Sequence, residues 1–326
     1  MQQSTCGELR TSVLGFGCGS AMGRVGRGAS LRAMGAAWSA GITLFDTARS
    51  YGFGEAEAVL GEFLRGKRQQ AVVATKFGIS PQKLGTLKRM ALPVARAAKQ
   101  LNVPGLRSAA RHGNNHPPLV GSFTVEGLRA SLDESLKQLR TDYVDILFLH
   151  EASMGSMHQQ DLMADLDALV QAGKVLRVGL YASAEVIAEV IMNGPPTLGA
   201  MQFGADLFDP TVSAFHERNQ RGLLLIANHP FGSALRVARM KAVLAVMTAD
   251  ETVPRELRDK LHEGDWPVLL EAIFGVILKG MGAHALVFSM MRADHLRDNV
   301  RAVESNRFSY EDVALIQNRL LNELTA

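Results

Sequence analysis

The sequence has few cysteines and no long uninterrupted apolar run. Its 326 residues include two cysteines, Cys6 and Cys18, which lie near each other and form no CxxC pattern. This excludes a disulfide framework and offers no ligand spacing for a structural metal, so we expect reduced thiols and no metal site. The most apolar stretch, "PVLLEAIFGVILKGMG", is interrupted by Glu271 and Lys279 and is too short and too charged to span a bilayer.

The N-terminal "MQQSTCGELR" contains no apolar segment of the signal-peptide type. Hydrophobic residues make up 47% and charged residues 21% of the chain, which is typical of a globular protein with a large core. We therefore expect a cytoplasmic protein, and we expect it to bind neither membranes nor nucleic acid. The oligomeric state stays open at this point.

Two phosphate-binding fingerprints are also missing. Neither "GFGCGS" nor "GRVGRGAS" has the G-x-G-x-x-G spacing of a dinucleotide-binding sheet, and no Walker A sequence occurs. What the chain does contain is an alternation of short apolar strands with segments of helical period. The eight candidate strands are 11–17, 43–47, 71–77, 143–150, 175–182, 198–206, 222–230 and 284–290. Buried strands alternating with helices indicate a parallel sheet, and eight such units favour a (β/α)8 barrel of the α/β class.

Titratable residues follow three consecutive strands at the point where each strand ends. The second strand ends in Asp46, with Tyr51 just beyond it, the third ends in Lys76, and the fourth ends in His150. Because the active sites of barrel enzymes lie at the C-terminal ends of the strands, we expect these four side chains to meet on one rim.

These four residue types suit proton transfer to a carbonyl group. A phenol has an ordinary pKa of about 10, and a nearby ammonium such as Lys76 favours the phenolate of Tyr51. Asp46 would keep a buried Lys76 charged, and His150 could orient a carbonyl oxygen beside the phenol. We therefore predict a general acid that serves carbonyl reduction or the reverse oxidation.

Several long stretches resemble the aldo-keto reductase superfamily. "GITLFDTARSYGFGEAEAVLGEFL" and "SLKQLRTDYVDILFLH" are similar to its two signatures, "ATKFG" to its lysine strand, and "TCGELRTSVLGFGCG" to its N-terminal hairpin and first strand. The resemblance implies a single domain over 1–326, a (β/α)8 TIM barrel with an N-terminal β-hairpin. It also implies hydride transfer from NADP(H), less often NAD(H), to an aldehyde or ketone. Tyr51 would be the acid, Lys76 and Asp46 would tune it, and His150 would position the substrate.

The resemblance also implies a set of cofactor-binding residues, although this half of the pattern is altered. The set is Gly17, Cys18, Asp46, Gln202, Pro230, Gly232, Ser233, Arg292, Asp298 and Asn299. Tyr181 and Ala182 stand where the family has a polar Ser-Asn pair, and Asn228 stands where it often has a stacking Tyr. Ser289 and His295 occupy the usual cation positions, which weakens the preference for the 2′-phosphate of NADP. NADP(H) remains ahead of NAD(H) as the expected cofactor.

A long basic insertion follows the third strand, at about 78–122. Between residues 63 and 125 there are eleven Lys or Arg and no Asp or Glu, whereas the rest of the chain carries 24 basic and 32 acidic residues. A helical pattern inside the insertion contains Pro93, which should break or kink it. The first interpretation is a solvated lid. The alternatives are a lid that attracts an anionic substrate or the cofactor phosphates, and a membrane-surface helix.

Three functions are compatible with these observations. The first is an NADP(H)-dependent oxidoreductase that reduces small aldehydes and ketones to alcohols. The second is an NAD-dependent sugar or polyol dehydrogenase, in which the same four residues serve oxidation. The third is a regulatory barrel that senses the cofactor with little turnover, a hypothesis suggested by the altered residues Tyr181 and Asn228.

Overall fold

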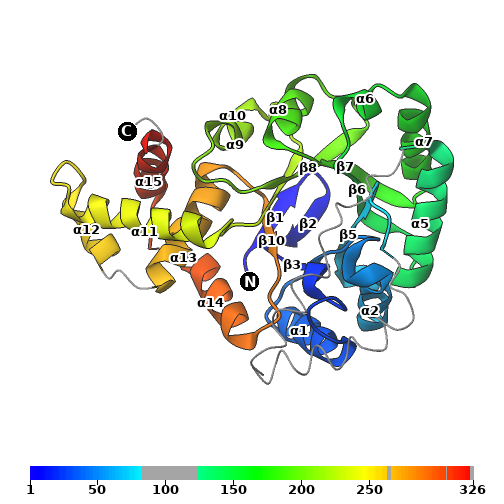
Figure 1. The fold of residues 1–326 in the computed structure, drawn as a ribbon, viewed down its shortest axis with the longest axis horizontal. Coiled ribbons are helices and arrows are strands. Elements are labelled where there is room, and N and C mark those ends of the chain that lie inside the picture. The colour runs from blue at the N-terminus through cyan, green and yellow to red at the C-terminus, as the bar shows by residue number, and fades with distance from the viewer. Residues whose placement is uncertain (83–122, 263–265, 306, 324–326) are drawn as a thin grey trace.

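Eight parallel strands close into a barrel in the computed structural model, which describes residues 1–82, 123–262, 266–305 and 307–323 (Figure 1). The strands are β3 (Leu14–Gly17), β4 (Leu44–Asp46), β5 (Val72–Phe77), β6 (Val144–His150), β7 (Val175–Tyr181), β8 (Leu198–Gly204), β9 (Leu224–Asn228) and β10 (Ala285–Phe288). Each candidate strand of the sequence contains one of them. The predicted (β/α)8 fold is confirmed.

An N-terminal hairpin covers the end of the barrel where the strands begin. It consists of β1 (Gln3–Cys6) and β2 (Leu9–Ser12), which pair antiparallel. Cys6 packs among the side chains of the barrel interior, and Arg177 Nη2, near the start of β7, donates to the carbonyl oxygen of Cys6 at 3.1 Å. The predicted hairpin is therefore present, and it leaves the opposite end of the barrel open.

Helices surround the barrel in the order that the sequence predicts. The main ones are α1 (Arg27–Ser39), α2 (Ala56–Phe63), α5 (Val125–Leu139), α7 (Gln160–Gln171), α8 (Ala184–Asn193), α14 (Ala293–Glu304) and α15 (Tyr310–Asn322). Helix α5 illustrates how local sequence sets where a helix begins. Thr124 is its N-cap and accepts a hydrogen bond from the backbone N–H of Gly127 at 3.1 Å. Its leucines at helical spacing are buried against the barrel.

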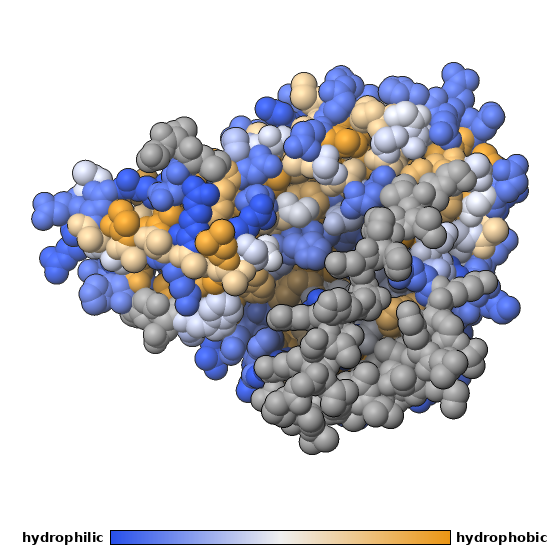
Figure 2. All heavy atoms as spheres, viewed as in Figure 1, coloured by the Kyte–Doolittle hydropathy of each residue, from blue (hydrophilic) through white to orange (hydrophobic). Residues whose placement is uncertain are grey.

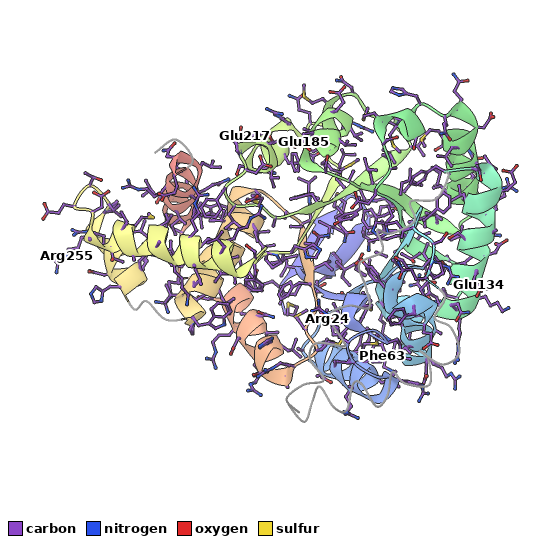
Figure 3. All side chains as sticks on the ribbon, viewed as in Figure 1. Arg24, Phe63, Glu134, Glu185, Glu217 and Arg255 are labelled. Carbon is purple, nitrogen blue, oxygen red and sulfur yellow. The ribbon has the colours of Figure 1, made fainter. Side chains whose placement is uncertain are left out.

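The region between β9 and β10 projects from the barrel. It contains α11 (Ala234–Ala249), α12 (Arg255–His262), α13 (Trp266–Gly275) and a π-helical turn at Val276–Gly280. Figure 3 places Arg255 at the outer tip of this projection, and Figure 2 shows apolar side chains among charged ones on its surface.

The remaining elements are short. After β6 comes α6 (Met154–Met157). Between β8 and β9 lie two short helices, α9 (Pro210–Ser213) and α10 (Phe215–Arg218). Single turns of 3-10 helix follow β3 at Cys18–Ser20 and precede β5 at Arg68–Gln70, and a third, at Tyr51–Gly54, follows β4.

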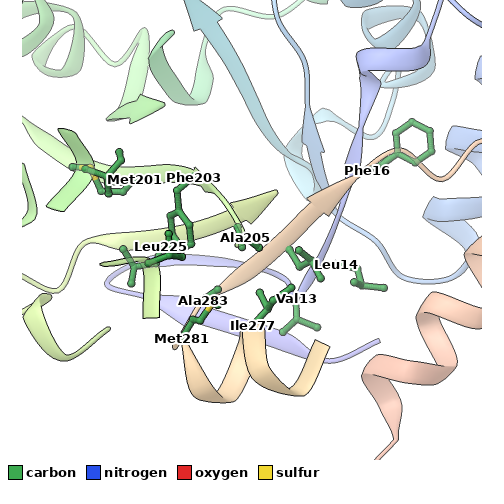
Figure 4. Packing of buried hydrophobic residues seen from close by; sticks show 14 of the residues in the cluster. Val13, Leu14, Phe16, Met201, Phe203, Ala205, Leu225, Ile277, Met281 and Ala283 are labelled. Carbon is green, nitrogen blue, oxygen red and sulfur yellow. The ribbon is translucent and has the colours of Figure 1, made fainter. Parts of the chain in front are cut away.

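Alternate residues of each strand face the barrel interior. Leu44, Phe148 and Ile226 belong to the interior cluster, whereas Phe16 and Phe203 belong to the layer between strands and helices, part of which Figure 4 shows. Because side chains alternate along a strand, the next inward position on six strands lies at the open end of the barrel. Those positions are Asp46, Lys76, His150, Tyr181, Gln202 and Asn228.

The predicted basic insertion falls almost entirely on residues 83–122, which lie outside the described residues. Its lid and membrane-surface interpretations therefore stay predictions.

Candidate active site

A buried ion pair lies at the center of the open end. Lys76 Nζ donates to Asp46 Oδ1 and to the carbonyl oxygen of Thr47, the latter at 3.0 Å. Both charged side chains are buried. From the other side of the barrel, Gln202 Nε2 donates to the same Asp46 oxygen at 3.1 Å. The carboxylate thereby joins β4, β5 and β8, and its hydrogen bonds offset the cost of burying two charges.

Tyr51 stands above this pair on the turn that follows β4. The turn depends on Gly52, which has a φ of +58° and where a Cβ would collide with the backbone oxygen of Ala21. The turn places the Tyr51 ring over the ammonium, with Lys76 Nζ 5.2 Å from the ring centroid.

The expected effect of Lys76 on the phenol is not the dominant one. Burial, followed by the charge of Asp46, raises the pKa of Tyr51 well above its ordinary value of 10. The Lys76 ammonium therefore does not bring the pKa of Tyr51 below its ordinary value in the free protein, because burial and the Asp46 charge outweigh it. Tyr51 therefore keeps its proton at neutral pH, as a proton donor must.

His150 ends β6 beside the phenol. Its ring lies perpendicular to that of Tyr51, with 6.4 Å between the ring centroids. Burial and the nearby Lys76 charge lower the pKa of His150 to about 3. The imidazole is therefore neutral at physiological pH and acts as a hydrogen-bond partner without bringing a second cation into the site.

Two further residues lie at this end of the barrel, Tyr181 and Asn228, which are not among the residues that the sequence predicts for the site. The ring of Tyr181 lies 5.3 Å from that of His150 between centroids, and its phenol interacts with the side chain of Asn228. The sequence shows them only as departures from the family pattern. The sequence does hold a signal for them: every second residue of a strand faces the barrel interior, and Tyr181 and Asn228 are the last such residues of their strands.

Several of the cofactor-binding residues predicted near β9 and β10 line one pocket. A pocket of about 390 Å³ is lined by Pro230, Gly232, Asp298 and Asn299, together with Ser289, His295 and aromatic side chains. Four of the predicted residues thus share one pocket, which adjoins the loop after β9 and helix α14.

The other predicted cofactor residues lie elsewhere. Ser233 is the N-cap of α11 and accepts a hydrogen bond from the backbone N–H of Arg236 at 3.2 Å. Arg292 is exposed and pairs with Asp294 at 2.5 Å, outside the pocket lining. Gly17 and Cys18 are buried at the end of β3, where Gly17 is the backbone neighbour of Asp46. Burial also raises the pKa of the Cys18 thiol, which keeps it unreactive.

Buried unpaired oxygens show that the open end fits a ligand with N–H groups. Gln202 Oε1 and Asn228 Oδ1 accept no hydrogen bond from the described residues. A nicotinamide ring carries a carboxamide with N–H donors, so the residues present fit this group, which supplies a hydride when bound. Within the same described ranges, no group of three or more His, Cys, Asp or Glu side chains could hold a metal ion, and no helix has the length and apolar character needed to cross a membrane.

The fold and this site define a (β/α)8 barrel protein with a titratable set at its C-terminal face, where barrel enzymes carry their active sites. The sequence matches the Aldo/keto reductase family over residues 13–263. The chain therefore belongs to the aldo/keto reductase family and is an oxidoreductase.

Individual relatives agree with this assignment. Aldo-keto reductase ausK of Emericella nidulans is 24% identical, with the match covering 95% of this chain and 77% of that protein. L-galactose dehydrogenase of Arabidopsis thaliana is 28% identical over 58% of this chain. D-threo-aldose 1-dehydrogenase of a Pseudomonas species is 29% identical over 53% of this chain. These last two matches span 50% and 59% of the relatives' own lengths.

The fold of aldo-keto reductase AKR11C1 from Bacillus halodurans, in its holo form, is similar to this one. It superposes with a TM-score of 0.69 at 21% identity, covering 98% of this chain and 96% of that chain.

Proposed function

We propose that the protein is a nicotinamide-dependent oxidoreductase that reduces small aldehydes and ketones to alcohols. The observation that carries the proposal is the buried Lys76–Asp46 pair placed against Tyr51, with a neutral His150 beside the phenol. A carbonyl oxygen bound between Tyr51 and His150 accepts hydrogen bonds from both. Tyr51 then gives its proton to that oxygen as negative charge develops on it.

Lys76 acts on the phenolate that this transfer leaves. Its ammonium lies 5.2 Å from the Tyr51 ring, inside a site from which most solvent is excluded, so its attraction to the new anion is strong. Asp46 holds the ammonium in place and keeps it charged. In the oxidative direction the same groups remove a proton from an alcohol.

The charges of the residues that line the 390 Å³ pocket favour NAD(H), whereas the sequence analysis favoured NADP(H). The described lining residues of the 390 Å³ pocket include Asp298 and no Lys or Arg, and Arg292 is engaged by Asp294. A 2′-phosphate favours cations and is repelled by a carboxylate, whereas a ribose 2′-hydroxyl can donate to one. We therefore propose NAD(H) as the preferred cofactor.

A second candidate function is a sugar or polyol dehydrogenase that uses NAD. The names of two relatives, L-galactose dehydrogenase and D-threo-aldose 1-dehydrogenase, favour it. The third hypothesis, a cofactor-sensing barrel with little turnover, requires binding without chemistry.

One experiment separates these functions. The purified protein is titrated with NADH and NADPH by fluorescence, and turnover is then measured on a panel of aromatic aldehydes, ketones and aldoses. For Tyr51→Phe we expect kcat/KM to fall by about 10²–10⁴, the usual contribution of a general acid, while the Kd for NADH stays within about threefold. Tyr310→Phe, an exposed tyrosine at the start of α15, is the matched control and keeps full activity.

Each function has its own outcome. Turnover of aldoses with NAD⁺ and none of simple carbonyls would establish the second function in place of the first. Tight cofactor binding without turnover on the whole panel would establish the third. Undiminished turnover in Tyr51→Phe would remove Tyr51 from the mechanism.

A further inference from the structure

Two buried amide oxygens at the open end of the barrel have no hydrogen-bond partner. They are Oε1 of Gln202 and Oδ1 of Asn228, and among the described residues no group donates to either. Gln202 is completely buried, and Asn228 is 9% exposed. Since buried polar atoms are nearly always satisfied, each of these oxygens needs a partner that the described part of the chain does not provide.

The orientation of the Gln202 amide is fixed by its neighbour. Its Nε2 donates to Asp46 Oδ1 at 3.1 Å. An ionised carboxylate only accepts hydrogen bonds, so the flipped amide would set two oxygens against each other. Oε1 is therefore the free acceptor.

Tyr181 completes a group of three polar side chains on consecutive strands. Its Cα pairs with that of Gln202 across β7 and β8, and β9 carries Asn228. The phenol interacts with the Asn228 side chain. Burial, and then the charge of Glu151, raise the pKa of Tyr181, so the hydroxyl keeps a proton that it can donate.

The three groups offer two acceptors and one donor, which is the complement of a primary carboxamide. Such a group has two N–H donors and one carbonyl acceptor. We propose that Tyr181, Gln202 and Asn228 form a three-point site for the carboxamide of the nicotinamide ring. The two N–H groups donate to Gln202 Oε1 and Asn228 Oδ1, and the carbonyl accepts from the Tyr181 hydroxyl.

This inference rests on the proposed function and extends it to Asn228, to which the family resemblance gives no role at the carboxamide. The resemblance implies that Gln202 binds the carboxamide, together with a Ser-Asn pair that this chain replaces by Tyr181 and Ala182. Here the phenol of Tyr181 on β7 interacts with the side chain of Asn228 on β9, so an amide is present at the site although the Ser-Asn pair is absent.

The proposed carboxamide site is continuous with the catalytic groups. Gln202 is hydrogen-bonded to Asp46, and the Tyr181 ring lies 5.3 Å from that of His150. Of the three side chains, Tyr181 is half-buried and the other two are buried.

The test compares NAD⁺ with its 3-acetylpyridine analogue, which keeps the carbonyl and has a methyl group in place of NH₂. Kd is measured for both dinucleotides by calorimetric titration with the wild type, Asn228→Leu and Tyr181→Phe. Each hydrogen bond contributes about three- to tenfold in affinity, so the wild type should bind NAD⁺ at least about tenfold more tightly than the analogue. In Asn228→Leu this ratio should fall several-fold, because one acceptor is lost. In Tyr181→Phe both dinucleotides should weaken together and the ratio should persist, since both keep the carbonyl.

Asn299→Ala is the matched control. It removes an amide from the pocket beside α14, so it should weaken both dinucleotides equally and leave their ratio unchanged. Circular dichroism shows whether each variant is folded, and Asn228→Ser replaces Asn228→Leu if the latter is not.

Two results would overturn the site. One is equal wild-type affinity for the two dinucleotides, and the other is a ratio that survives in the folded Asn228 variant. Binding of neither dinucleotide by the wild type would instead reject the proposed function itself.

Discussion

The two sides of the barrel mouth satisfy their polar groups in different ways. On the catalytic side, formed by β4, β5 and β6, the charges of Asp46 and Lys76 are paired with each other inside the protein. On the opposite side, formed by β7, β8 and β9, the oxygens of Gln202 and Asn228 have no donor among the described residues. The first side is preorganised in the free protein, whereas we propose that the carboxamide of the cofactor completes the second.

This difference parallels the way the two sides resemble the family. The catalytic side keeps the whole motif, because proton transfer needs a fixed phenol, a fixed cation and a neutral imidazole together. The other side carries Tyr181 and Asn228 in place of the family's residues, which the proposed site explains because a carboxamide can be held by any arrangement that offers the right donors and acceptors.

The largest effect is expected when one member of the buried Lys76–Asp46 ion pair is removed. Lys76→Met leaves the Asp46 carboxylate buried without its cation, and we expect the free energy of unfolding to fall by about 3–5 kcal/mol. Urea denaturation at pH 7 measures this change. Lys174→Met is the matched control because it breaks an exposed pair with Asp133, 3.2 Å apart, and should cost less than about 1 kcal/mol.

A double variant sharpens this prediction. Lys76→Met combined with Asp46→Leu removes the uncompensated charge and should recover part of the lost stability. Equal losses from Lys76→Met and Lys174→Met would show that the buried pair is no different from a surface pair.

A smaller effect should appear in the pH dependence of stability through His150. Its pKa is about 3 in the folded protein, against about 6.5 in the unfolded chain. As the pH falls below 6.5, the imidazole binds a proton in the unfolded chain but stays neutral in the folded protein. The free energy of unfolding therefore decreases toward acidic pH.

We expect His150→Gln to reduce the stability lost between pH 7 and pH 4.5 by about 2 kcal/mol, or a few degrees in Tm. Thermal melts of both proteins at the two pH values measure the difference. Parallel curves for wild type and variant would contradict the view that His150 is buried as a neutral group.

The smallest effect is expected for the cofactor affinity when a residue of the 390 Å³ pocket is changed. Ser289→Lys adds a cation to the 390 Å³ pocket, and we expect NADPH affinity to rise about tenfold while NADH affinity barely changes. Fluorescence titration measures both values, with Ser289→Gln as the control of similar bulk without the charge. An equal gain for both cofactors would show that the added lysine does not meet the 2′-phosphate.

Much of the fold could be predicted from the sequence because its signals are local. The alternation of apolar strands with helical segments depends on nearby residues, and the structure confirms it. Between β8 and β9 the helical segment is divided into α9 and α10, and only α9 has a side-chain N-cap, in which Asp209 accepts from the backbone N–H of Thr211 at 2.8 Å. In the site, strand ends placed Asp46, Lys76 and His150 on one rim, and the structure brings them together with Tyr51.

By itself, the sequence determined the barrel, the open end of its strands and the four titratable residues found there. The tertiary structure decided that burial and Asp46 raise the pKa of Tyr51, that Asp294 pairs with Arg292, and that the Tyr181 phenol interacts with the Asn228 side chain. These outcomes depend on desolvation and on competition between partners that are distant in the chain. No local pattern encodes them, because each is set by everything that packs around the group.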